Sequence, residues 1–241
     1  MSPKSEVITL YARQLKIPSF TRYQEVLRQQ EQLGYEDFLI AMMKQELASR
    51  SANQQKRRIK QAGFPTQKTL EEFDFTRLKH VEEAYVYQLA SCDFIRNRQN
   101  VLMLGNPGSG KTHLSIALGI KACQVGFRVK FATAATLATM LVEAKETKEL
   151  LRLERQLHKA DLLIIDELSY LSFNRHQSEL LFKVISDRTE RSSVIISTNL
   201  EFSRWTELFE NPALISALVD RLTFRAHILN MNNPSYRMDN G

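Results

Sequence analysis

One short stretch holds residues whose types and spacing would let them bind a nucleoside triphosphate. Gly105, Gly110, Lys111 and Thr112 fit the pattern G-x-x-x-x-G-K-[ST] of a phosphate-binding loop. Glycines let the backbone turn its N–H groups toward the phosphates, and the helix that follows adds its positive N-terminal end. In this pattern the lysine reaches the β- and γ-phosphates, and the threonine hydroxyl ligates Mg²⁺. The stretch predicts contacts with ATP and Mg²⁺ from Gly105, Asn106, Pro107, Gly108, Ser109, Gly110, Lys111, Thr112 and His113.

Two acidic residues stand at the end of an apolar run further along the chain. The run LLIIDE, Leu162–Glu167, is typical of a parallel strand that is buried on both faces. At its end, Asp166 is placed to hold the Mg²⁺ shell and Glu167 to polarise an attacking water. The alternative is that the two acids are the N-cap and the first turn of a helix. The phosphate-binding loop upstream favours the metal-and-water interpretation.

A third polar group follows the next apolar run. Ser193–Ser197 is predicted to be a strand, and Asn199 comes two residues after it. The amide of Asn199 would touch the γ-phosphate or orient the water, or it would only cap a turn or helix. The order of the motifs favours the active-site role.

These groups need a scaffold in which several strands end at the same edge of a sheet. After residue 77 the sequence alternates segments with helical and strand periodicity. Such alternation predicts an α/β fold with a doubly wound, mostly parallel sheet. The predicted helices are Leu78–Phe94, Lys111–Val125, Ala135–Ala160 with a break near Glu146–Lys148, His176–Arg191 and Asn211–Leu222, and the predicted strands are Val101–Leu104, Arg128–Thr133, Leu162–Glu167, Ser193–Ser197 and Arg225–Asn230.

Length and composition suit one such domain with a smaller appendage. The chain has 241 residues, of which 43% are hydrophobic, enough for a sizeable core. No apolar run approaches the roughly 20 residues that cross a bilayer, and the first residues lack the apolar core of a secretory signal. Cys92 and Cys123 show no metal-ligand spacing and are predicted to be ordinary thiols of a reducing, cytoplasmic compartment.

Positive charge is concentrated in the first quarter of the chain. Residues 1–62 carry 11 Lys and Arg against 6 acidic residues, whereas residues 63–241 carry 22 against 21. Apolar positions at helical spacing predict an all-helical N-terminal domain that is interrupted at Pro18 and Gly34. Its third helix, from Tyr35, has a basic end that would neutralise phosphates of DNA or RNA, unless it is only a solvated helix end. The candidate DNA contacts are Arg50, Lys56, Arg57, Arg58 and Lys60.

A linker joins this domain to the nucleotide-binding domain. Because glycine and proline interrupt the helical pattern, residues 63–77 are predicted to be a linker between domains at residues 1–62 and 78–241. Phe73 and Phe75 in the linker either flank an adenine pocket or only pin the linker to the core, and we favour pinning.

Several stretches together resemble one protein family. The chain resembles the IstB-like transposition helper ATPases, of the DnaC-related branch of the AAA+ superfamily, in GNPGSGKTHLS, LLIIDELSYL, ISTNLEFSRW, DRLTFRAHIL and the tail SYR. The similarity covers roughly residues 35–238. It implies an AAA+ fold that assembles on duplex DNA with ATP and directs the transposase of an insertion sequence. The resemblance matches Gly105–Thr112 to Walker A, Asp166 and Glu167 to Walker B, Asn199 to sensor 1, Arg221 to an arginine finger and Arg237 to sensor 2.

The implied arginine finger sets the expected assembly. Arg221 would enter the site of a neighbouring copy, so the resemblance implies a homo-oligomer, ring or helical, with ATP between subunits. The alternative is a salt bridge within the chain to Asp220 or another nearby acid. Only 11 residues follow the last predicted strand, so we expect little or no C-terminal lid to hold Arg237. The predicted catalytic groups are Lys111, Glu167, Asn199, Arg221 and Arg237.

Three other functions fit parts of this pattern. A replicative helicase loader of the DnaC type would share the ATPase core but carry a helicase-binding N-terminus. A small-molecule kinase would share the phosphate-binding loop, although no later segment is an evident lid for a phosphate acceptor. A purely structural DNA-binding module is disfavoured by the intact set of Lys111, Asp166 and Glu167. We favour a DNA-dependent assembly ATPase that assists a transposase.

Overall fold

Two compact units make up the chain, Met1–Arg57 and Arg58–Gly241. The computed structural model describes residues 3–29, 34–168, 173–189, 191–207, 212–233 and 235. Within these residues the first unit is helical, and the second is an α/β unit with a parallel sheet. The predicted fold class is therefore confirmed, whereas the predicted domain limits remain a prediction.

Helices account for the regular structure of the N-terminal unit where it is described. They are α1 (Pro3–Gln14), the 3-10 helix η1 (Pro18–Arg22), α2 (Tyr23–Gln29) and the first part of α3 (Tyr35–Ala62). Pro18 is the first residue of η1, where its fixed φ angle suits a helix start. Gly34 comes directly before α3, so both predicted helix breakers lie at the start of a helix.

A buried carboxylate ties this unit together. Glu46 of α3 is 6% exposed and accepts the backbone N–H of Ser19 at 3.0 Å and Nε of Arg50 at 2.7 Å. Arg50 also donates Nη2 to the carbonyl of Lys16 at 2.7 Å. Hydrogen bonds to a charged group contribute more than neutral ones, and here they join α3 to the turn after α1.

Part of the apolar surface of the N-terminal unit remains exposed. Ala12 and Met42 are buried, but other apolar residues at helical spacing are half exposed or nearly so. A large exposed apolar surface is typical of a site that contacts another protein. The exposed residues are Val7, Leu10 and Tyr11 on α1, Leu15 just after it, and Leu39, Ile40, Met43 and Leu47 on α3.

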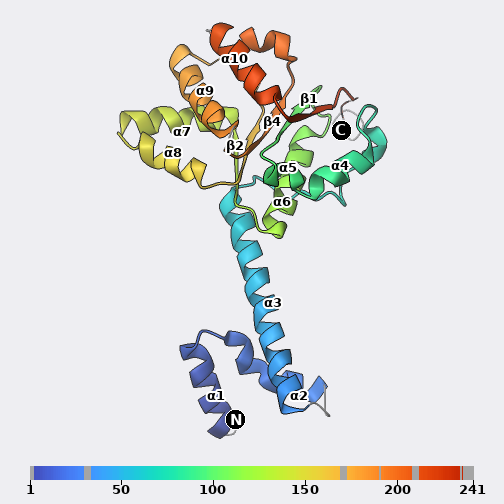
Figure 1. Ribbon diagram of the computed structural model, residues 1–241, viewed down its shortest axis with the longest axis vertical. Helices are drawn as coiled ribbons and strands as arrows, with labels where there is room; N and C mark the ends of the chain where they lie inside the picture. Colours follow the sequence, from blue (N-terminus) through green and yellow to red (C-terminus); the bar gives the residue numbers. More distant parts are fainter. Residues whose placement is uncertain are drawn as a thin grey trace. The chain divides into compact units, whose positions relative to one another are not determined.

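A five-stranded sheet forms the centre of the second unit (Figure 1). Each neighbouring pair of strands runs parallel, as the alternation of helices and strands predicted. Because the strands are parallel, the segments that follow β1, β3 and β4 start from the same edge of the sheet. The strands are β1 (Asn100–Leu104), β2 (Val129–Thr133), β3 (Leu162–Asp166), β4 (Ser193–Thr198) and β5 (Ala226–Asn230), in the order β2-β3-β4-β1-β5.

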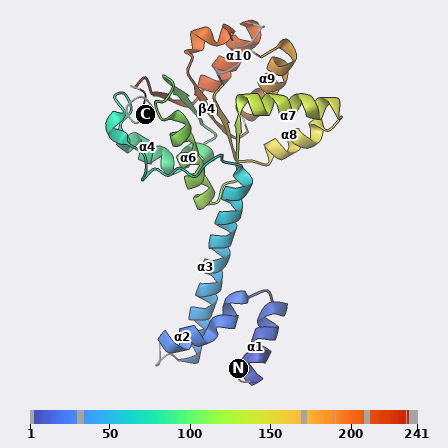
Figure 2. The same ribbon diagram turned by 180° about the vertical axis from the view of Figure 1, so that it is seen from behind.

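Helices cover both faces of this sheet (Figures 1 and 2). Successive strand residues point to opposite faces, so Val101 and Met103 enter one core and Leu102 enters the other. On the first face lie α4 (Glu83–Ala90), α5 (Asp93–Arg96) and α6 (Lys111–Val125), and on the second lie α7 (Ala134–Glu146), α8 (Leu150–His158), α9 (Arg175–Thr189) and α10 (Pro212–Thr223). Two 3-10 helices, η2 (Phe75–Arg77) and η3 (Phe202–Glu207), lie in the connections.

Two element predictions were wrong in detail. The predicted helix Leu78–Phe94 is two short helices, since α4 starts only at Glu83 and the left-handed backbone of Cys92, with φ of 64°, separates it from α5. The predicted strand Leu162–Glu167 ends one residue early, because Glu167 also has a positive φ of 58°. No helix in the described part of the chain is both long and apolar enough to span a bilayer.

Candidate nucleotide-binding and hydrolysis site

The phosphate-binding loop connects β1 to α6, and two of its glycines have clear physical causes. A Cβ atom on Gly105 would lie 2.1 Å from the carbonyl oxygen of Met231, whose N–H bonds the carbonyl of Leu104 at 2.6 Å. Gly110 has a φ of 94°, in the left-handed region that favours glycine, and directly precedes the first residue of α6. A side chain is therefore excluded at Gly105 by contact and disfavoured at Gly110 by backbone conformation.

The ammonium group of Lys111 lies inside this loop. Lys111 is 7% exposed, and its Nζ donates to the carbonyls of Gly105 at 2.6 Å and Asn106 at 2.8 Å. It also lies 3.5 Å from the hydroxyl of Ser109. Phosphate oxygens are charged acceptors and bind an ammonium group more strongly than carbonyls do. The loop thus places a positive charge where a triphosphate would lie.

The predicted Mg²⁺ ligands contact each other. Thr112 donates its hydroxyl to Asp166 Oδ2 at 2.8 Å, and Asp166 at the end of β3 is 2% exposed. Ser197 donates its hydroxyl to the other carboxylate oxygen, Asp166 Oδ1. A hydroxyl and a carboxylate are the hard oxygen ligands that Mg²⁺ prefers. The residues present therefore fit a Mg²⁺ ion beside the phosphate-binding loop.

Glu167 turns out of the strand and lines the cleft next to this pair. Its φ of 58° is uncommon for a residue with a side chain and costs about 1–2 kcal/mol. Its N–H donates to the hydroxyl of Ser197 at 3.0 Å. A strained backbone at an acidic residue beside a phosphate-binding loop is typical of functional sites.

The end of β4 joins the other motifs, because β4 lies between β1 and β3 in the sheet. The side chain of Ser197 contacts the acidic turn after β3. The carbonyl of Thr198 accepts the N–H of Gly105 at 3.2 Å, at the start of the phosphate-binding loop. Asn199, the next residue, lines the cleft. Ser197 thus contacts the acidic turn, Thr198 contacts the phosphate-binding loop, and Asn199 lines the cleft.

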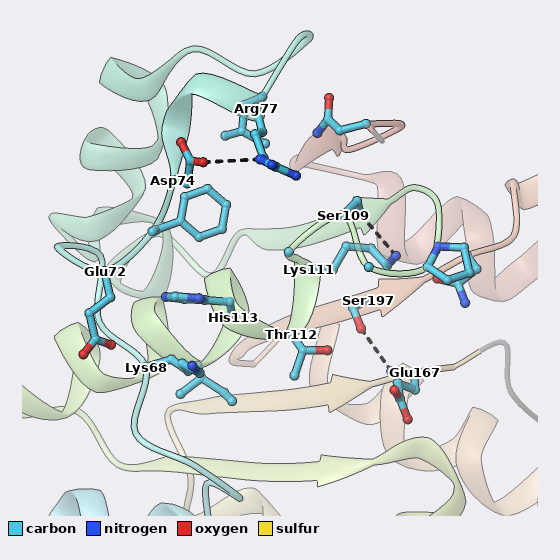
Figure 3. Close-up of a pocket in the computed structure, with 18 of the residues that line it drawn as sticks. Lys68, Glu72, Asp74, Arg77, Ser109, Lys111, Thr112, His113, Glu167 and Ser197 are labelled. Carbon is cyan, nitrogen blue, oxygen red and sulfur yellow. Dashed lines mark hydrogen bonds and ion pairs between the residues drawn. The ribbon is translucent and has the colours of Figure 1, made fainter. Parts of the chain in front are cut away.

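These groups share one cleft of about 400 Å³ (Figure 3). Figure 3 shows Thr112 between His113 on the left and Ser197 and Glu167 on the right, with Lys111 above them. Of the sequence-predicted residues, the lining includes Pro107, Gly108, Ser109, Gly110, Lys111, Thr112, His113, Glu167 and Asn199. Gly105, Asn106 and Asp166 are not in the lining but contact residues that are.

The linker before the sheet supplies the other wall. Phe73 lines the cleft and meets the ring of His113 edge-on, with centroids 5.1 Å apart. His113 Nε2 lies 2.8 Å from the carbonyl of Thr69, which ties the linker to the start of α6. Phe75 does not line the cleft and stacks instead on Tyr87. Both aromatic rings pack against the core, as the favoured interpretation held, and Phe73 also borders the cleft.

Sequence reasoning missed nine lining residues. Asp74 and Arg77 form an ion pair at 3.3 Å. The hydroxyl of Ser197 bonds to Asp166 and Glu167. Their only signal was proximity to a motif or to the aromatic pair, because linker and loop residues follow no periodic pattern. The missed residues are Thr66, Lys68, Glu72, Asp74, Arg77, Leu78, Ile116, Ser197 and Asn233.

Of the two predicted arginines, Arg221 does not line this cleft. Arg221 on α10 is exposed and donates Nη1 to the hydroxyl of Ser186 on α9 at 2.8 Å. In the described part of the chain no carboxylate pairs with Arg221, so the predicted alternative of a salt bridge to Asp220 is not formed. Arg237 lies outside the described residues.

The candidate DNA contacts differ in their surroundings. Arg50 is engaged by Glu46, as described above. Arg58 is half-buried and donates Nε to the carbonyl of Cys123 at 3.0 Å, within the second unit. Lys56, Arg57 and Lys60 are exposed on α3. The three exposed side chains are the ones with full freedom to reach a polyanion.

Comparison with known proteins places the chain in a family. The sequence model of the IstB-like ATP binding protein family matches residues 11–241. The chain is 39% identical over 227 residues to the insertion sequence IS21 putative ATP-binding protein of Pseudomonas aeruginosa, covering 93% of this chain and 86% of that one. It is 34% identical over 206 residues to the insertion sequence IS5376 putative ATP-binding protein of Geobacillus stearothermophilus, covering 86% and 82%.

Solved structures resemble about two thirds of the chain in fold. AMPPCP-bound DnaA from Aquifex aeolicus matches with a TM-score of 0.60 and 19% identity over 70% of this chain and 51% of that chain. A DnaC helicase loader matches with a TM-score of 0.52 and 19% identity over 67% and 95%. The resemblance predicted from the motifs is thereby confirmed. The chain belongs to the IstB-like ATP-binding protein family and is an ATPase with the AAA+ fold.

Proposed function

We propose that this ATPase assembles with ATP as a homo-oligomer on duplex DNA and assists the transposase of an insertion sequence. The observation that carries the proposal is the cleft itself, in which Thr112 contacts Asp166 beside Lys111, Glu167 and Asn199. The relatives named for insertion sequences, IS21 and IS5376, support the biological setting.

Within one subunit the residues divide the work of hydrolysis. Lys111 binds the β- and γ-phosphates, and Glu167 orients the attacking water and takes its proton. The Asn199 amide contacts the γ-phosphate or that water. Thr112 and Asp166 would hold Mg²⁺, which would offset the negative charge of the phosphates when bound. The chemistry serves to change the assembly state, so the nucleotide acts as a switch.

Arg221 supports an assembly with ATP between subunits. It is exposed on α10, carries no ion pair to a described carboxylate, and does not line the cleft of its own chain. An arginine supplied by a neighbour stabilises charge on the transferred phosphoryl group. A head-to-tail contact of this kind produces a ring or an open helix. The exposed apolar residues of α1 and α3 would form a second contact surface between subunits.

Basic residues of α3 support contact with a nucleic acid backbone. Lys56, Arg57 and Lys60 are exposed, and each would form a weak, sequence-independent phosphate contact. In an oligomer such contacts act together, so affinity grows through avidity without any base reading. Binding is expected to weaken steeply with salt.

The test is particle size with and without ligands. Electron microscopy and mass measurement of the full chain, with duplex DNA and a non-hydrolysable ATP analogue, should show oligomers that need both ligands. Lys111→Ala should remain unassembled, because it lacks the ammonium group that binds the phosphates. A wild-type protein that stays monomeric at saturating ATP analogue and duplex would overturn the proposal.

The helicase-loader alternative shares the fold, since the DnaC loader is similar in structure. At 19% identity that similarity shows the fold alone, whereas the relatives at 39% and 34% are insertion-sequence proteins. Preference for single-stranded over duplex DNA, with capture of a helicase instead of a transposase, would favour the loader. A phosphorylated small-molecule product would favour the kinase.

A further inference from the structure

We propose that Ser197 is a positioning residue for the two acidic groups of the cleft, Asp166 and Glu167. The proposal rests on the proposed function, in which these carboxylates serve ATP hydrolysis. Ser197 lies in β4, is 1% exposed and lines the cleft (Figure 3). It lies within the ISTNLEFSRW stretch, but no role was predicted for it, and within its strand it is a small polar residue after an apolar run.

The hydroxyl and the backbone carbonyl of Ser197 both bond to one turn. A serine hydroxyl has one donor and two acceptor positions. Ser197 donates to Asp166 Oδ1 and accepts the N–H of Glu167 at 3.0 Å. Its backbone carbonyl accepts the N–H of Leu168 at 3.0 Å. One residue of β4 thereby binds three consecutive residues at the end of β3 and just after it.

This arrangement fixes the orientation of the Asp166 carboxylate. Ser197 bonds Oδ1 and Thr112 bonds Oδ2, so the plane of the carboxylate is set from both sides. Asp166 is buried, and a buried carboxylate oxygen without a donor is costly. Without the Ser197 hydroxyl, Oδ1 would turn toward another donor, and Oδ2 would leave the position that Thr112 shares.

The same hydroxyl stabilises the unusual backbone of Glu167. The φ of 58° is what turns Glu167 out of the strand, and the N–H of this residue has Ser197 as its acceptor. If that acceptor is removed, the backbone is free to return to an ordinary φ. The Glu167 carboxylate would then move away from the water it orients, while the phosphate-binding loop itself stays intact.

The first experiment compares two serines of the same strand. Ser197→Ala removes the positioning hydroxyl, and Ser193→Ala removes a buried hydroxyl that donates to the Phe94 carbonyl at 3.1 Å, outside the cleft. For Ser197→Ala we expect kcat with duplex DNA to fall about 10–100-fold, the usual effect of removing a group that orients a ligand residue. Affinity for a fluorescent ATP analogue without Mg²⁺ should change less than about threefold, since uniform binding is untouched. Ser193→Ala should retain wild-type kcat.

Two readouts do not depend on activity. In Ser197→Ala the increase in ATP-analogue affinity on adding Mg²⁺ should shrink, because Asp166 no longer presents Oδ2 correctly. Hydrogen exchange of a peptide spanning residues 162–168 should become faster, because the Glu167 amide no longer has its acceptor.

A second pair of variants removes the effect of a folding defect. Ser197→Thr keeps the hydroxyl and Ser197→Val does not, while both add similar volume at a buried position. Threonine should recover most of the kcat that alanine removes, and valine should not. Equal kcat for the two, or a wild-type kcat and Mg²⁺ response in Ser197→Ala, would overturn the proposal. Glu167→Gln distinguishes failure of the proposed function from failure of the Ser197 proposal. If Glu167→Gln still hydrolyses ATP at the wild-type rate, the proposed function is wrong. If Glu167→Gln is inactive but Ser197→Ala has wild-type kcat, only the positioning role of Ser197 is wrong.

Discussion

Single atoms decide the geometry of the phosphate-binding loop. The loop is pressed against the segment after β5, and Gly105 has no room for even a methyl group beside Met231. The obstacle is a backbone carbonyl, which moves only if the strand beside it moves. Glycine at position 105 is thus required by the segment after β5 as well as by the phosphates.

Gly105→Ala is expected to destabilise the fold and impair ATP binding together. Overpacking of this kind costs about 1–3 kcal/mol, and relief of the 2.1 Å contact must displace Met231 or the loop. Denaturant unfolding and ATP-analogue affinity measure the two effects. Gly34→Ala is the control, because among the described residues a Cβ there meets only Asp37 Oδ2, at 3.5 Å. A Gly105→Ala protein as stable as the control would show that the close contact is absent in solution.

The two thiols should be inert in the native protein. Burial raises the pKa of Cys92 and of Cys123 to about 11, from an ordinary value of 9.0. Only the thiolate reacts, so at pH 8 a thiol reagent should label the native chain far more slowly than the chain in denaturant. Since the folded pKa is raised, the neutral thiols contribute stability that is complete below pH 9 and declines as pH rises toward 11. Rapid labelling of the native protein at pH 8 would contradict their burial.

At the scale of helices and strands, the sequence predicted the site well where a motif lies directly at the end of a strand or the start of a helix. The helix after the phosphate-binding loop begins at Lys111, as predicted, because the glycine turn and the helix start are adjacent in sequence. The break between α7 and α8 also falls where the sequence indicated. The sequence offered Phe73 as a possible wall of the cleft, but Arg77 could not be predicted there, because it reaches the cleft through the path of a linker. Ser197 was missed for a related reason, since its partners come from another strand.

The basic end of α3 should control how DNA binding responds to salt. Replacing the three exposed residues Lys56, Arg57 and Lys60 with alanine should reduce the slope of log K against log salt by about 3, near 0.9 for each phosphate that is no longer neutralised. Fluorescence anisotropy with a duplex at several salt concentrations measures the slope. Removal of the same number of exposed charges at Lys148, Arg155 and Lys159 is the control. An unchanged slope would remove the α3 end from the DNA interface, and Arg58, which bonds the Cys123 carbonyl, is left in place to protect folding.

At the scale of the whole molecule, Arg221 lies apart from the other groups that are proposed to serve ATP hydrolysis. The cleft contains groups that bind and activate, whereas Arg221 lies on α10 and lines no part of that cleft. If the proposed assembly is right, every active centre draws on two chains. At each boundary between subunits, a substitution in the cleft then affects the subunit that binds ATP, and a substitution of Arg221 affects its neighbour.

Two inactive proteins should therefore complement each other. Glu167→Gln alone and Arg221→Ala alone should each hydrolyse little ATP, because every boundary lacks one necessary group. In an equal mixture about a quarter of the boundaries would pair an intact cleft with an intact arginine by random association. A coupled assay of phosphate release should show activity reappearing on mixing, with no such recovery when Glu167→Gln is mixed with Lys111→Ala. Because of one exposed side chain on α10, the activity of each subunit would depend on which copy of the chain binds next to it.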